Sequence, residues 1–528
     1  MLVALAYLFG LFVDLTGDSG LYAAISRQMV ESGDWFKLKI NGVPYDQKPH
    51  LFFWLGGLGI QLFGNSNFAF KLFPFIYGAA GIYFTFRLGK QLFSDEAGKW
   101  AALISGTSQI YFLYFFDLHT DSVLQTGVVL ALWQLAAYLQ SQKPVNFVFG
   151  FLGVGLAMLS KGPVGAILPC FAVFMYLLAE RDFKQLFHPK WLLGIFIAII
   201  VISPTLIHLY NSFGFNGLKF YFVTNNIGRI TGNYAGSSTD YFFYLHTLLW
   251  AFLPWTIIVT ASVFSTVKHW FTRKEDSKWS IYLLGSVFTL VLILSIAKGK
   301  APNYFLIAVA PISVLAAKWL VQNKSVPVNR LRLFLVAQIV FIFLQALILI
   351  FVVFVFSENN IRIPAILLVV LLNVILFTVK TGIQPFQKLI LSSLIIAGSF
   401  NLFLNVKVLP DLFAYQGVRQ VLKLYEEKST PDSKLYNLGI EEYALFFYAR
   451  QRVENIEKWD ELRVAITKPR AWIYTNEIDY KEMLFQKLPI DTVYQIRQRG
   501  MNRINMEFLN PKTREQSLTT NYLIVTGD

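Results

Sequence analysis

The sequence of 528 residues contains a single cysteine and few charged side chains. One cysteine, Cys170, excludes a disulfide within the chain and any metal site built from several cysteines. Its position in an apolar run predicts that it packs as a small residue. Only 15% of the residues are charged and 55% are hydrophobic, whereas soluble domains carry about 25% charged residues. This shortage of charge predicts a polytopic membrane protein.

Acidic residues are scarcer than basic ones, with 32 Asp and Glu against 46 Lys and Arg and a formal net charge of +14. No nucleic-acid partner is expected, because no soluble basic domain or base-stacking motif accompanies this charge. The excess instead predicts cytoplasmic lysines and arginines that orient membrane spans. The sequence also shows no internal repeat and no low-complexity tract.

Long apolar runs recur up to about residue 405, and a span needs about twenty such residues. Residues 1–13 form a shorter run, which lacks the basic region and cleavage site of a secretory signal. We expect this run to be an uncleaved first helix. Counting it, the sequence predicts 13 spans. Their centres are expected near residues 7, 78, 107, 130, 152, 172, 201, 253, 288, 312, 344, 370 and 396.

Basic connectors predict how these spans are oriented, since Lys and Arg accumulate on the cytoplasmic side. With an odd number of spans, the N-terminus lies inside, and residues 14–54 and the C-terminal region lie outside. The basic residues that define the inner face are Arg87, Lys90, Lys99, Arg181, Lys184, Lys190, Lys268, Arg273, Lys274, Lys278, Lys318, Lys324, Arg330, Arg332, Lys380 and Lys388.

The composition changes from about residue 407 to charged, mixed segments. Short β-like runs at 434–438, 471–475, 492–496 and 522–525 alternate with helical stretches such as 441–451. This pattern is typical of a small α/β domain. We therefore expect residues 1–406 to form a transmembrane domain and residues 407–528 to form a soluble α/β domain outside the cytoplasm.

Residues 14–54 form a polar connector that is unusually long, because helix connections in bundles usually take about 2–8 residues. Within it, Asp18 precedes a helical pattern typical of an amphipathic helix at the membrane interface. Asp18 or Ser19 could instead simply cap that helix. One face of the expected helix carries Tyr22, Ile25, Met29 and Val30.

Several other charged residues stand at expected outer span ends, and each has two interpretations. Lys48, in YDQKPHLFFWL, either reaches the membrane surface or binds a phosphate as a point charge. Asp121, in DLHTDSVLQ, either caps a span or supplies a second carboxylate opposite Asp18. A cradle for an anionic lipid headgroup is indicated by Lys161, Arg229, Lys298 and Lys300. His208 and His246 are expected to be hydrogen-bonded side chains rather than metal ligands.

Six segments in this order resemble the bacterial polyprenyl-phosphate-sugar glycosyltransferases of the GT-C type. These comprise the lipid A 4-amino-4-deoxy-L-arabinose transferases and the protein O-mannosyltransferase-like proteins. The segments are GDSGLYAAI, YDQKPHLFFWL, DLHTDSVLQ, LSKGPVGAILP, NNIGRITGNY through FLPWT, and SIAKGKAPNYFLIAVAP. The resemblance spans residues 1 to about 325. It implies an enzyme of the bacterial inner membrane that takes sugar from a polyprenyl-phosphate donor on the periplasmic face.

The resemblance also implies roles for individual residues. Asp18 matches the catalytic aspartate, and Asp121 resembles the second acidic position. Lys48 matches the lysine that contacts the lipid phosphate. Further donor-phosphate contacts are implied for Arg229, Lys298, Lys300 and Tyr304, and substrate contacts are expected for Tyr22, Tyr45 and Lys161.

The sequence departs from the family pattern at two positions that bear on metal binding. Ser19 and Gln47 stand where many members have acidic residues, so a metal site through those carboxylates is not supported. We expect that no cofactor is required.

The chemistry fits these residues. Asp18 can deprotonate an acceptor hydroxyl, and Lys48 with Arg229 can stabilise the departing phosphate. Attack from the face opposite the phosphate predicts inversion at the anomeric carbon. The acceptor can be a lipid A-like lipid, another glycan or a protein.

Two other classes of function stay open. A transporter or flippase for a lipid-linked sugar would also need many spans, but is expected to carry mid-membrane charges and repeated halves. A scaffold or lipid-binding module would explain an outer domain. It gives no reason for acidic and basic groups around one rim, so the enzyme interpretation is favoured.

Overall fold

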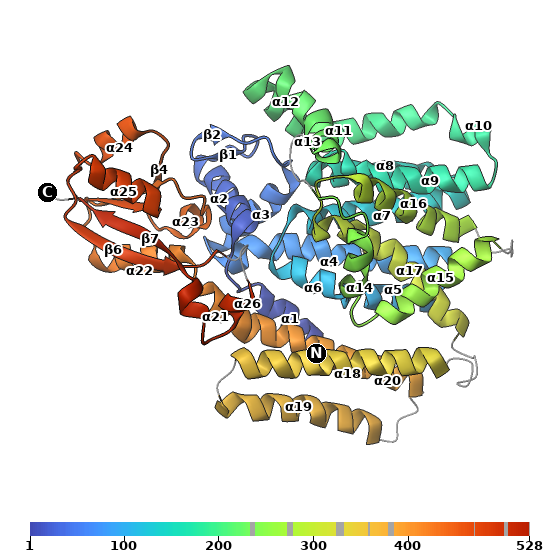
Figure 1. Ribbon diagram of the computed structural model, residues 1–528. Coiled ribbons are helices and arrows are strands. Elements are labelled where there is room, and N and C mark those ends of the chain that lie inside the picture. Colours follow the sequence, from blue (N-terminus) through green and yellow to red (C-terminus); the bar gives the residue numbers. More distant parts are fainter. Residues whose placement is uncertain are drawn as a thin grey trace.

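The computed structural model describes residues 1–232, 238–271, 278–323, 332–356, 359–378, 385–468, 470–500 and 505–526. Figure 1 shows a large assembly of helices with a smaller unit of strands and helices at one end, drawn in orange and red. The protein is a multi-span helical membrane protein, as the composition predicts.

Eight helical stretches in the described residues are long and apolar enough to cross a membrane. Each contains one of the predicted span centres. The stretches are Asn67–Leu92 (α4), Thr120–Ser141 (α7), Pro144–Lys161 (α8), Phe183–Phe213 (α10 and α11), Lys278–Ile296 (α16), Pro302–Asn323 (η2 and α17), Val336–Phe356 (in α18) and Gln387–Phe413 (α20, η4 and α21). Shorter apolar helices occupy Leu51–Phe63 (α3), Val164–Ala179 (α9) and Arg362–Leu376 in α19 (Asn359–Thr378).

Two predicted span centres, near residues 107 and 253, fall at breaks between helices. The first break separates α5 (Asp95–Gly106) from α6 (Gln109–Phe116), and the second separates α14 (Phe243–Ala251) from α15 (Thr256–Phe271). The breaks meet: the Gln109 N–H donates to the Leu253 carbonyl at 2.9 Å, and Trp255 Nε1 donates to Thr107 Oγ1 at 2.8 Å. Each break therefore provides hydrogen-bond partners for polar groups of the other. A non-helical backbone inside a membrane protein needs such partners.

Helix α7 lies at the centre of the helical assembly, and 78% of the residues in its most apolar stretch are buried. Small residues allow α8 to approach it closely. A Cβ atom on Gly127 would lie 2.6 Å from the backbone nitrogen of Ala157, and one on Gly153 would lie 2.6 Å from that of Ala131. Such close approach through small residues is characteristic of packed membrane helices.

The polar connector at residues 14–54 folds into a helix, α2 (Gly17–Ser32), and a short hairpin of β1 (Lys39–Ile40) and β2 (Val43–Pro44). It follows the nine-residue helix α1 (Leu2–Gly10). On the predicted apolar face of α2, Tyr22, Ile25 and Met29 are buried and Val30 is half-buried.

Thr16, and not Asp18, is the N-cap of α2. The Thr16 N–H donates to Ser19 Oγ at 3.2 Å, so Ser19 closes the first turn from inside the helix. The interpretation of Asp18 as the cap is therefore wrong. The Asp18 side chain is left available for another role.

The C-terminal unit, residues 417–525, contains a five-stranded sheet of order β4-β3-β5-β7-β6. Strand β3 pairs in parallel with β4 and β5, while β7 pairs antiparallel with β5 and β6. The strands are β3 (Lys434–Leu438), β4 (Glu454–Ile456), β5 (Ala471–Thr475), β6 (Thr492–Gln498) and β7 (Thr519–Val525). Each predicted β-like run lies within a strand, and β4 was not predicted.

The helices of this unit are α22 (Gly417–Lys428), α23 (Ala444–Tyr448), α24 (Trp459–Ala465), α25 (Glu477–Phe485), α26 (Met506–Leu509) and η6 (Arg514–Ser517). The preceding helical stretch continues from α20 (Pro385–Phe403) through η4 (Leu404–Val408) and α21 (Leu409–Phe413). The expected boundary near residue 406 therefore falls inside this stretch, and the sheet unit begins about ten residues later.

Other sequence expectations have mixed outcomes. Cys170, predicted to pack as a small residue in an apolar run, lies exposed on the apolar helix α9. His208 is buried and its Nε2 lies 2.9 Å from the Tyr45 carbonyl oxygen, whereas His246 is exposed, 3.6 Å from Asp240.

Five of the basic residues used to orient the spans lie outside the described residues: Arg273, Lys274, Lys324, Arg330 and Lys380.

Candidate functional site

A cavity opens where the N-terminal ends of α2 and α7 meet the C-terminal end of α8 and the short helix α13 (Asn225–Thr231). It encloses about 1040 Å³, its mouth included. One part of its lining is charged: Asp18, Lys48, His119, Asp121, Lys161 and Arg229. Another part is apolar: Leu124, Val164, Ile167, Ile230, Leu290, Ile293, Leu294, Ala297 and Ile307.

Most of the site residues predicted from the sequence line this one cavity, although they come from distant segments of the chain. Those lining it are Asp18, Tyr22, Lys48, Asp121, Lys161, Arg229 and Tyr304. Lys298, Lys300 and Tyr45 are not among the lining residues. The functional role of every one of these residues stays a prediction.

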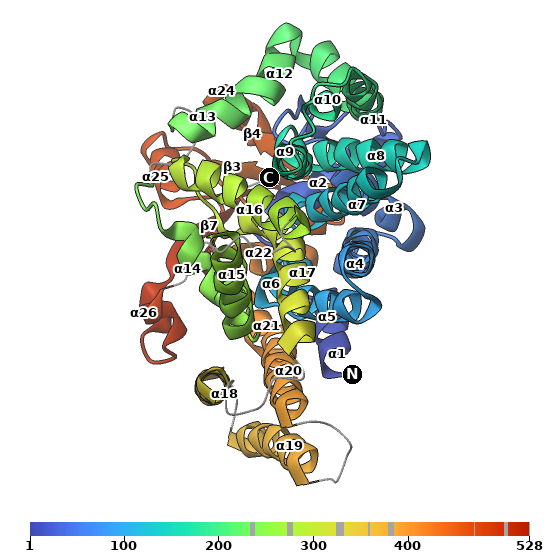
Figure 2. The same cartoon turned by 90° about the vertical axis from the view of Figure 1, so that its right-hand side faces the viewer.

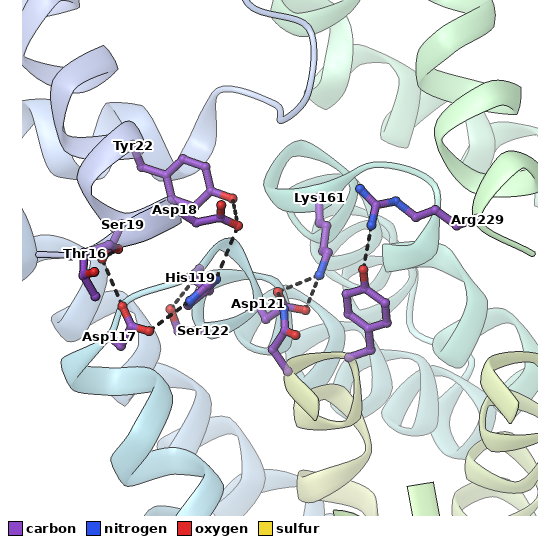
Figure 3. Close-up of polar contacts among 12 residues, drawn as sticks. Thr16, Asp18, Ser19, Tyr22, Asp117, His119, Asp121, Ser122, Lys161 and Arg229 are labelled. Atoms are coloured by element: carbon purple, nitrogen blue, oxygen red, sulfur yellow. Dashed lines mark hydrogen bonds and ion pairs between the residues drawn. The ribbon is translucent and has the colours of Figure 1, made fainter. Parts of the chain in front are cut away.

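Asp18 stands in the first turn of α2, and its side chain is 62% exposed at the cavity. The Tyr22 hydroxyl donates to Asp18 Oδ2 at 3.3 Å, and His119 Nδ1 lies 4.0 Å from the same oxygen. Figure 3 shows these contacts converging on one side of the carboxylate. Two neighbours therefore orient Asp18 while solvent or a ligand can still reach it.

His119 bridges two carboxylates, because its Nε2 lies 3.2 Å from Asp117 Oδ2 and its Nδ1 faces Asp18. The Ser19 hydroxyl donates to the other oxygen of Asp117 at 3.0 Å. Burial alone would lower the pKa of His119, but the neighbouring carboxylates of Asp117, Asp121 and Asp18 together raise that pKa above the ordinary histidine value.

No role was predicted for Asp117 and His119, which stand in the segment DLHTDSVLQ together with Asp121. The available signal was the alternation of Asp, His and Asp at a span end. It could not identify Asp18 as the group on the other side of His119, because Asp18 is about a hundred residues away in the chain.

Asp121 is nearly fully buried and forms an ion pair with Lys161. Lys161 Nζ lies 2.6 Å from both carboxylate oxygens, and Asn303 Nδ2 donates to one of them at 2.7 Å. His119 is the N-cap of α7, so the interpretation of Asp121 as the cap is wrong. The Lys161 ammonium also lies 4.2 Å from the ring centroid of Tyr304.

Arg229 reaches the cavity from α13 and is held by two neighbours. One guanidinium nitrogen donates to the Tyr304 hydroxyl at 2.7 Å, and Nε donates to Asn225 Oδ1 at 3.0 Å. Tyr304 thus contacts both Lys161 and Arg229, and these cations are fixed on the same side of the cavity.

Lys48, between β2 and α3, is the third cation that lines the cavity. Burial lowers the pKa of Lys48 to about 8, and the positive charges of Lys161 and Arg229 act in the same direction. The carboxylates of Asp18 and Asp121 act in the opposite direction. Three cations against two carboxylates leave the charged lining net positive, which favours an anionic ligand.

Lys298 and Lys300 lie next to the site without lining it. The backbone of the Lys298 segment is tied to α13: the Gly299 N–H donates to the Arg229 carbonyl at 3.0 Å, and the Lys298 N–H donates to the Ile230 carbonyl at 3.3 Å. The Lys300 ammonium donates to the Ala297 carbonyl. This segment therefore supports the helix that carries Arg229.

Tyr45 is buried against Phe53, with ring centroids 5.8 Å apart, and its backbone carbonyl contacts His208. The Tyr45 ring, directly after β2, packs in the protein interior and does not line the cavity.

Metal binding has little support in the part of the chain that the structure describes. No group of three or more His, Cys, Asp or Glu side chains in that part is placed to hold an ion. The carboxylates at the cavity instead face His119 and Lys161. Independence from metal stays a prediction.

Residues 47–208 match the family model of the dolichyl-phosphate-mannose-protein mannosyltransferases. Two curated relatives are named undecaprenyl phosphate-alpha-4-amino-4-deoxy-L-arabinose arabinosyl transferase. The one from Edwardsiella ictaluri is 28% identical over 312 residues, which are 57% of this chain and 54% of that protein. The one from Enterobacter sp. is 26% identical over 325 residues, 59% of this chain and 56% of that protein. The chain thus matches little more than half the length of these relatives.

The crystal structure of ArnT from Cupriavidus metallidurans bound to undecaprenyl phosphate resembles this fold with a TM-score of 0.75. The two chains are 18% identical, and the likeness covers 99% of this chain and 96% of that one. The resemblance to the GT-C type family is confirmed. An oligosaccharyltransferase from Archaeoglobus fulgidus in the apo form is a more distant match, with a TM-score of 0.52, 12% identity and coverage of 90% of this chain and 69% of that one.

The region matched by the family model contains only part of the cavity. It includes Lys48, Asp121 and Lys161, whereas Asp18 and Arg229 lie outside residues 47–208. The three-dimensional arrangement therefore adds two charged residues to the site that this sequence match alone does not cover.

Proposed function

We propose that this protein is an integral-membrane glycosyltransferase that transfers a sugar from a polyprenyl-phosphate donor to an acceptor. The observation that carries the proposal is the two-part lining of the cavity. Lys48, Lys161 and Arg229 form a cationic side, and apolar side chains from α7, α9 and α16 continue from it. A ligand with an anionic headgroup and a hydrocarbon tail fits both parts.

The comparisons support the chemical class of the donor. The curated relatives are named for transfer from undecaprenyl phosphate, and the ArnT crystal structure holds undecaprenyl phosphate. We propose the same kind of lipid carrier for this protein. The acceptor is a lipid A-like lipid, another glycan or a protein, and membrane lipids surround the chain.

In the proposed reaction, Asp18 accepts the proton of the acceptor hydroxyl as the hydroxyl oxygen attacks the anomeric carbon. The bond from that carbon to the phosphate oxygen breaks, and attack opposite the phosphate inverts the configuration. A positioned general base contributes about 10²–10⁴-fold. Tyr22 and His119 both contact Oδ2 of Asp18, so they orient the carboxylate toward the acceptor.

The departing phosphate gains negative charge, which fixed cations can stabilise without reorganising at the moment of reaction. Lys48 and Arg229 fill this role in the proposed mechanism. Asp121 holds Lys161, and Tyr304 contacts both Lys161 and Arg229, so this side of the cavity is preorganised.

We also propose 13 spans, including α1 and the broken stretches at residues 107 and 253. The protein lies in the bacterial inner membrane, and the cavity faces the periplasm. Residues 1–406 form the transmembrane domain with the outer catalytic loop at 14–54, and residues 407–528 form the soluble domain. The packing of α23 against α2 supports a position of the C-terminal unit on the same side as Asp18.

The test is a transfer assay followed by mass spectrometry, with the purified full-length protein in liposomes. Polyprenyl-phosphate sugars are offered with lipid and peptide acceptors to the wild type, Asp18→Asn and Lys48→Ala. Matched controls are Asp34→Asn and Lys37→Ala, which change an exposed ion pair in the same connector. We expect transfer by the wild type and both controls and its loss in the two site variants.

Other outcomes contradict the proposal in distinct ways. Full transfer by Asp18→Asn would remove Asp18 from the catalytic role. Donor binding by the wild type with neither transfer nor hydrolysis would favour a lipid-sugar transporter. We expect transfer to persist after chelation of divalent cations, and its loss would reveal a metal requirement.

A further inference from the structure

The two residues at the entrance to the catalytic helix α2 are held by the C-terminal unit. Arg419, on α22, donates from two guanidinium nitrogens to the two carboxylate oxygens of Asp14. The Leu15 N–H donates to the Tyr448 hydroxyl at 2.8 Å. These contacts join segments that are more than 400 residues apart in the chain.

Helix α4 completes this network. Asn67 Nδ2 donates to Asp14 Oδ1 at 2.9 Å, and the Tyr448 hydroxyl donates to Asn67 Oδ1 at 2.6 Å. The Tyr448 hydroxyl thus uses both its donor and its acceptor capacity. The Asp14 side chain is only 7% exposed and that of Arg419 is 60% exposed, so the bidentate pair is protected from water on the Asp14 side.

The same unit also touches α2 farther along the helix. A Cβ atom on Gly20 would lie 3.0 Å from Ala444 Cβ, which shows how closely α23 approaches one turn of α2. Arg27 donates to the carbonyls of Phe446 and Phe447 at 3.2 and 2.9 Å. The C-terminal unit therefore contacts α2 on both sides of the turn that carries Asp18.

The short path from Leu15 to Asp18 explains why these contacts matter. Only Thr16 and Gly17 separate the two residues, and Gly17 has a φ of 51°, a region that glycine adopts easily. The contacts of Asp18 itself, at 3.3 and 4.0 Å, are long. Tyr22 and His119 therefore orient the carboxylate, while the backbone of the first turn sets the position from which the side chain reaches them.

We propose that Arg419 and Tyr448 are positioning residues of the active site. They fix the backbone at Asp14 and Leu15 and thereby hold Asp18 beside His119 at the cavity. The C-terminal unit is then part of the frame of the catalytic centre and not only a cover or an acceptor-binding module. This inference rests on the proposed function.

The test compares Tyr448→Phe and Arg419→Ala with the wild type in the full-length protein, using the polyprenyl-phosphate sugar that the wild type transfers. Tyr448→Phe removes only the hydroxyl and keeps the ring. We expect kcat to fall by about 10- to 100-fold, because small displacements of a reacting group have effects of this size. The KM for the donor should change by less than about threefold, because Lys48 and Arg229 stand on other elements.

Arg450→Ala is the matched control. Arg450 Nε lies 3.2 Å from a carboxylate oxygen of Glu426, so this pair lies within the C-terminal unit and does not touch α2. It should leave kcat unchanged. In a double-mutant cycle, Asp14→Ala combined with Arg419→Ala should be no slower than Asp14→Ala alone, since Asp14→Ala already removes the contact with Arg419.

Hydrogen exchange of residues 12–22 gives a second readout that does not require activity. We expect faster exchange there in Tyr448→Phe and Arg419→Ala than in Arg450→Ala. Unchanged kcat and unchanged exchange in the first two variants would overturn the inference, as would a raised KM with normal kcat. If the wild type transfers no sugar, the proposed function fails, while exchange still decides whether the two residues hold this segment. If Arg419→Ala unfolds, Tyr448→Phe decides alone.

Discussion

Helices α7 and α18 (Arg332–Phe356) are both long enough to span a membrane, yet they occupy opposite environments. The more apolar helix is the less buried. In the most apolar stretch of α18, within Val336–Phe356, the mean hydropathy is 3.2 and 11% of the residues are buried. In the corresponding stretch of α7 the mean hydropathy is 1.4 and 78% of the residues are buried. Figure 2 shows α18 at the edge of the assembly and α7 inside it. Because lipid is as apolar as a protein interior, an apolar helix gains little by leaving the lipid.

The polar residues of α7 explain its central position. Gln125 Nε2 donates to the Gly78 carbonyl at 3.1 Å, the Tyr111 hydroxyl donates to Gln125 Oε1 at 2.8 Å, and Thr126 Oγ1 donates to the Tyr77 carbonyl at 3.0 Å. Such groups would be costly in lipid and need protein partners. The modest hydropathy of α7 therefore goes together with polar side chains whose partners are found only inside the protein.

The strongest test of this comparison is the buried ion pair at the N-terminal end of α7. Asp121→Asn or Lys161→Met leaves one charge unpaired, which should cost about 3–5 kcal/mol of stability. Sugar transfer should fall by about 10²-fold or more, because Lys161 loses its orientation or its charge. Thermal unfolding and the transfer assay measure the two effects.

The double variant Asp121→Leu/Lys161→Met separates stability from catalysis. It should regain most of the lost stability, since neither charge remains, without regaining transfer. Recovery of transfer in the double variant would show that the pair has only a structural role.

A smaller loss of stability is expected when a larger side chain is placed on α7 or on α18. Gly127→Leu should force α7 and α8 apart and lower stability by about 1–3 kcal/mol or more, because the new side chain meets the backbone of Ala157. Val340→Leu, on the exposed face of α18, should change stability by less than about 0.5 kcal/mol. Thermal unfolding in the same detergent compares them, and an equal loss in both would contradict the contrast between the helices.

The smallest expected effect is a pH dependence from Lys48, which faces the N-terminal end of α7 across the cavity. Its pKa of about 8 lies below the usual lysine value because of burial, so its charge is present below pH 8 and is lost as the pH rises through that value. The kcat/KM for the donor should therefore fall by about tenfold per pH unit above this pKa. A Lys48→Arg variant stays charged and should lack this decline. A decline that persists in the variant would assign the titration to another group.

Some features followed from the sequence alone. Apolar runs of sufficient length located eight long helical stretches, and alternating segments located four strands of the C-terminal unit. Ordered motifs indicated Asp18, Lys48, Asp121, Lys161 and Arg229, which line one cavity. These features depend on local composition or on short motifs, so they can be identified without knowing which segments meet.

Only the tertiary structure decided which distant residues contact one another. The breaks at residues 107 and 253 satisfy each other across the fold, and His119 bridges Asp117 and Asp18 from separate elements. Arg419 and Tyr448 reach Asp14 and Leu15 from the other end of the chain. A polar group in or beside a membrane is satisfied by whichever partner the packing brings close, and local sequence patterns carry no information about that partner.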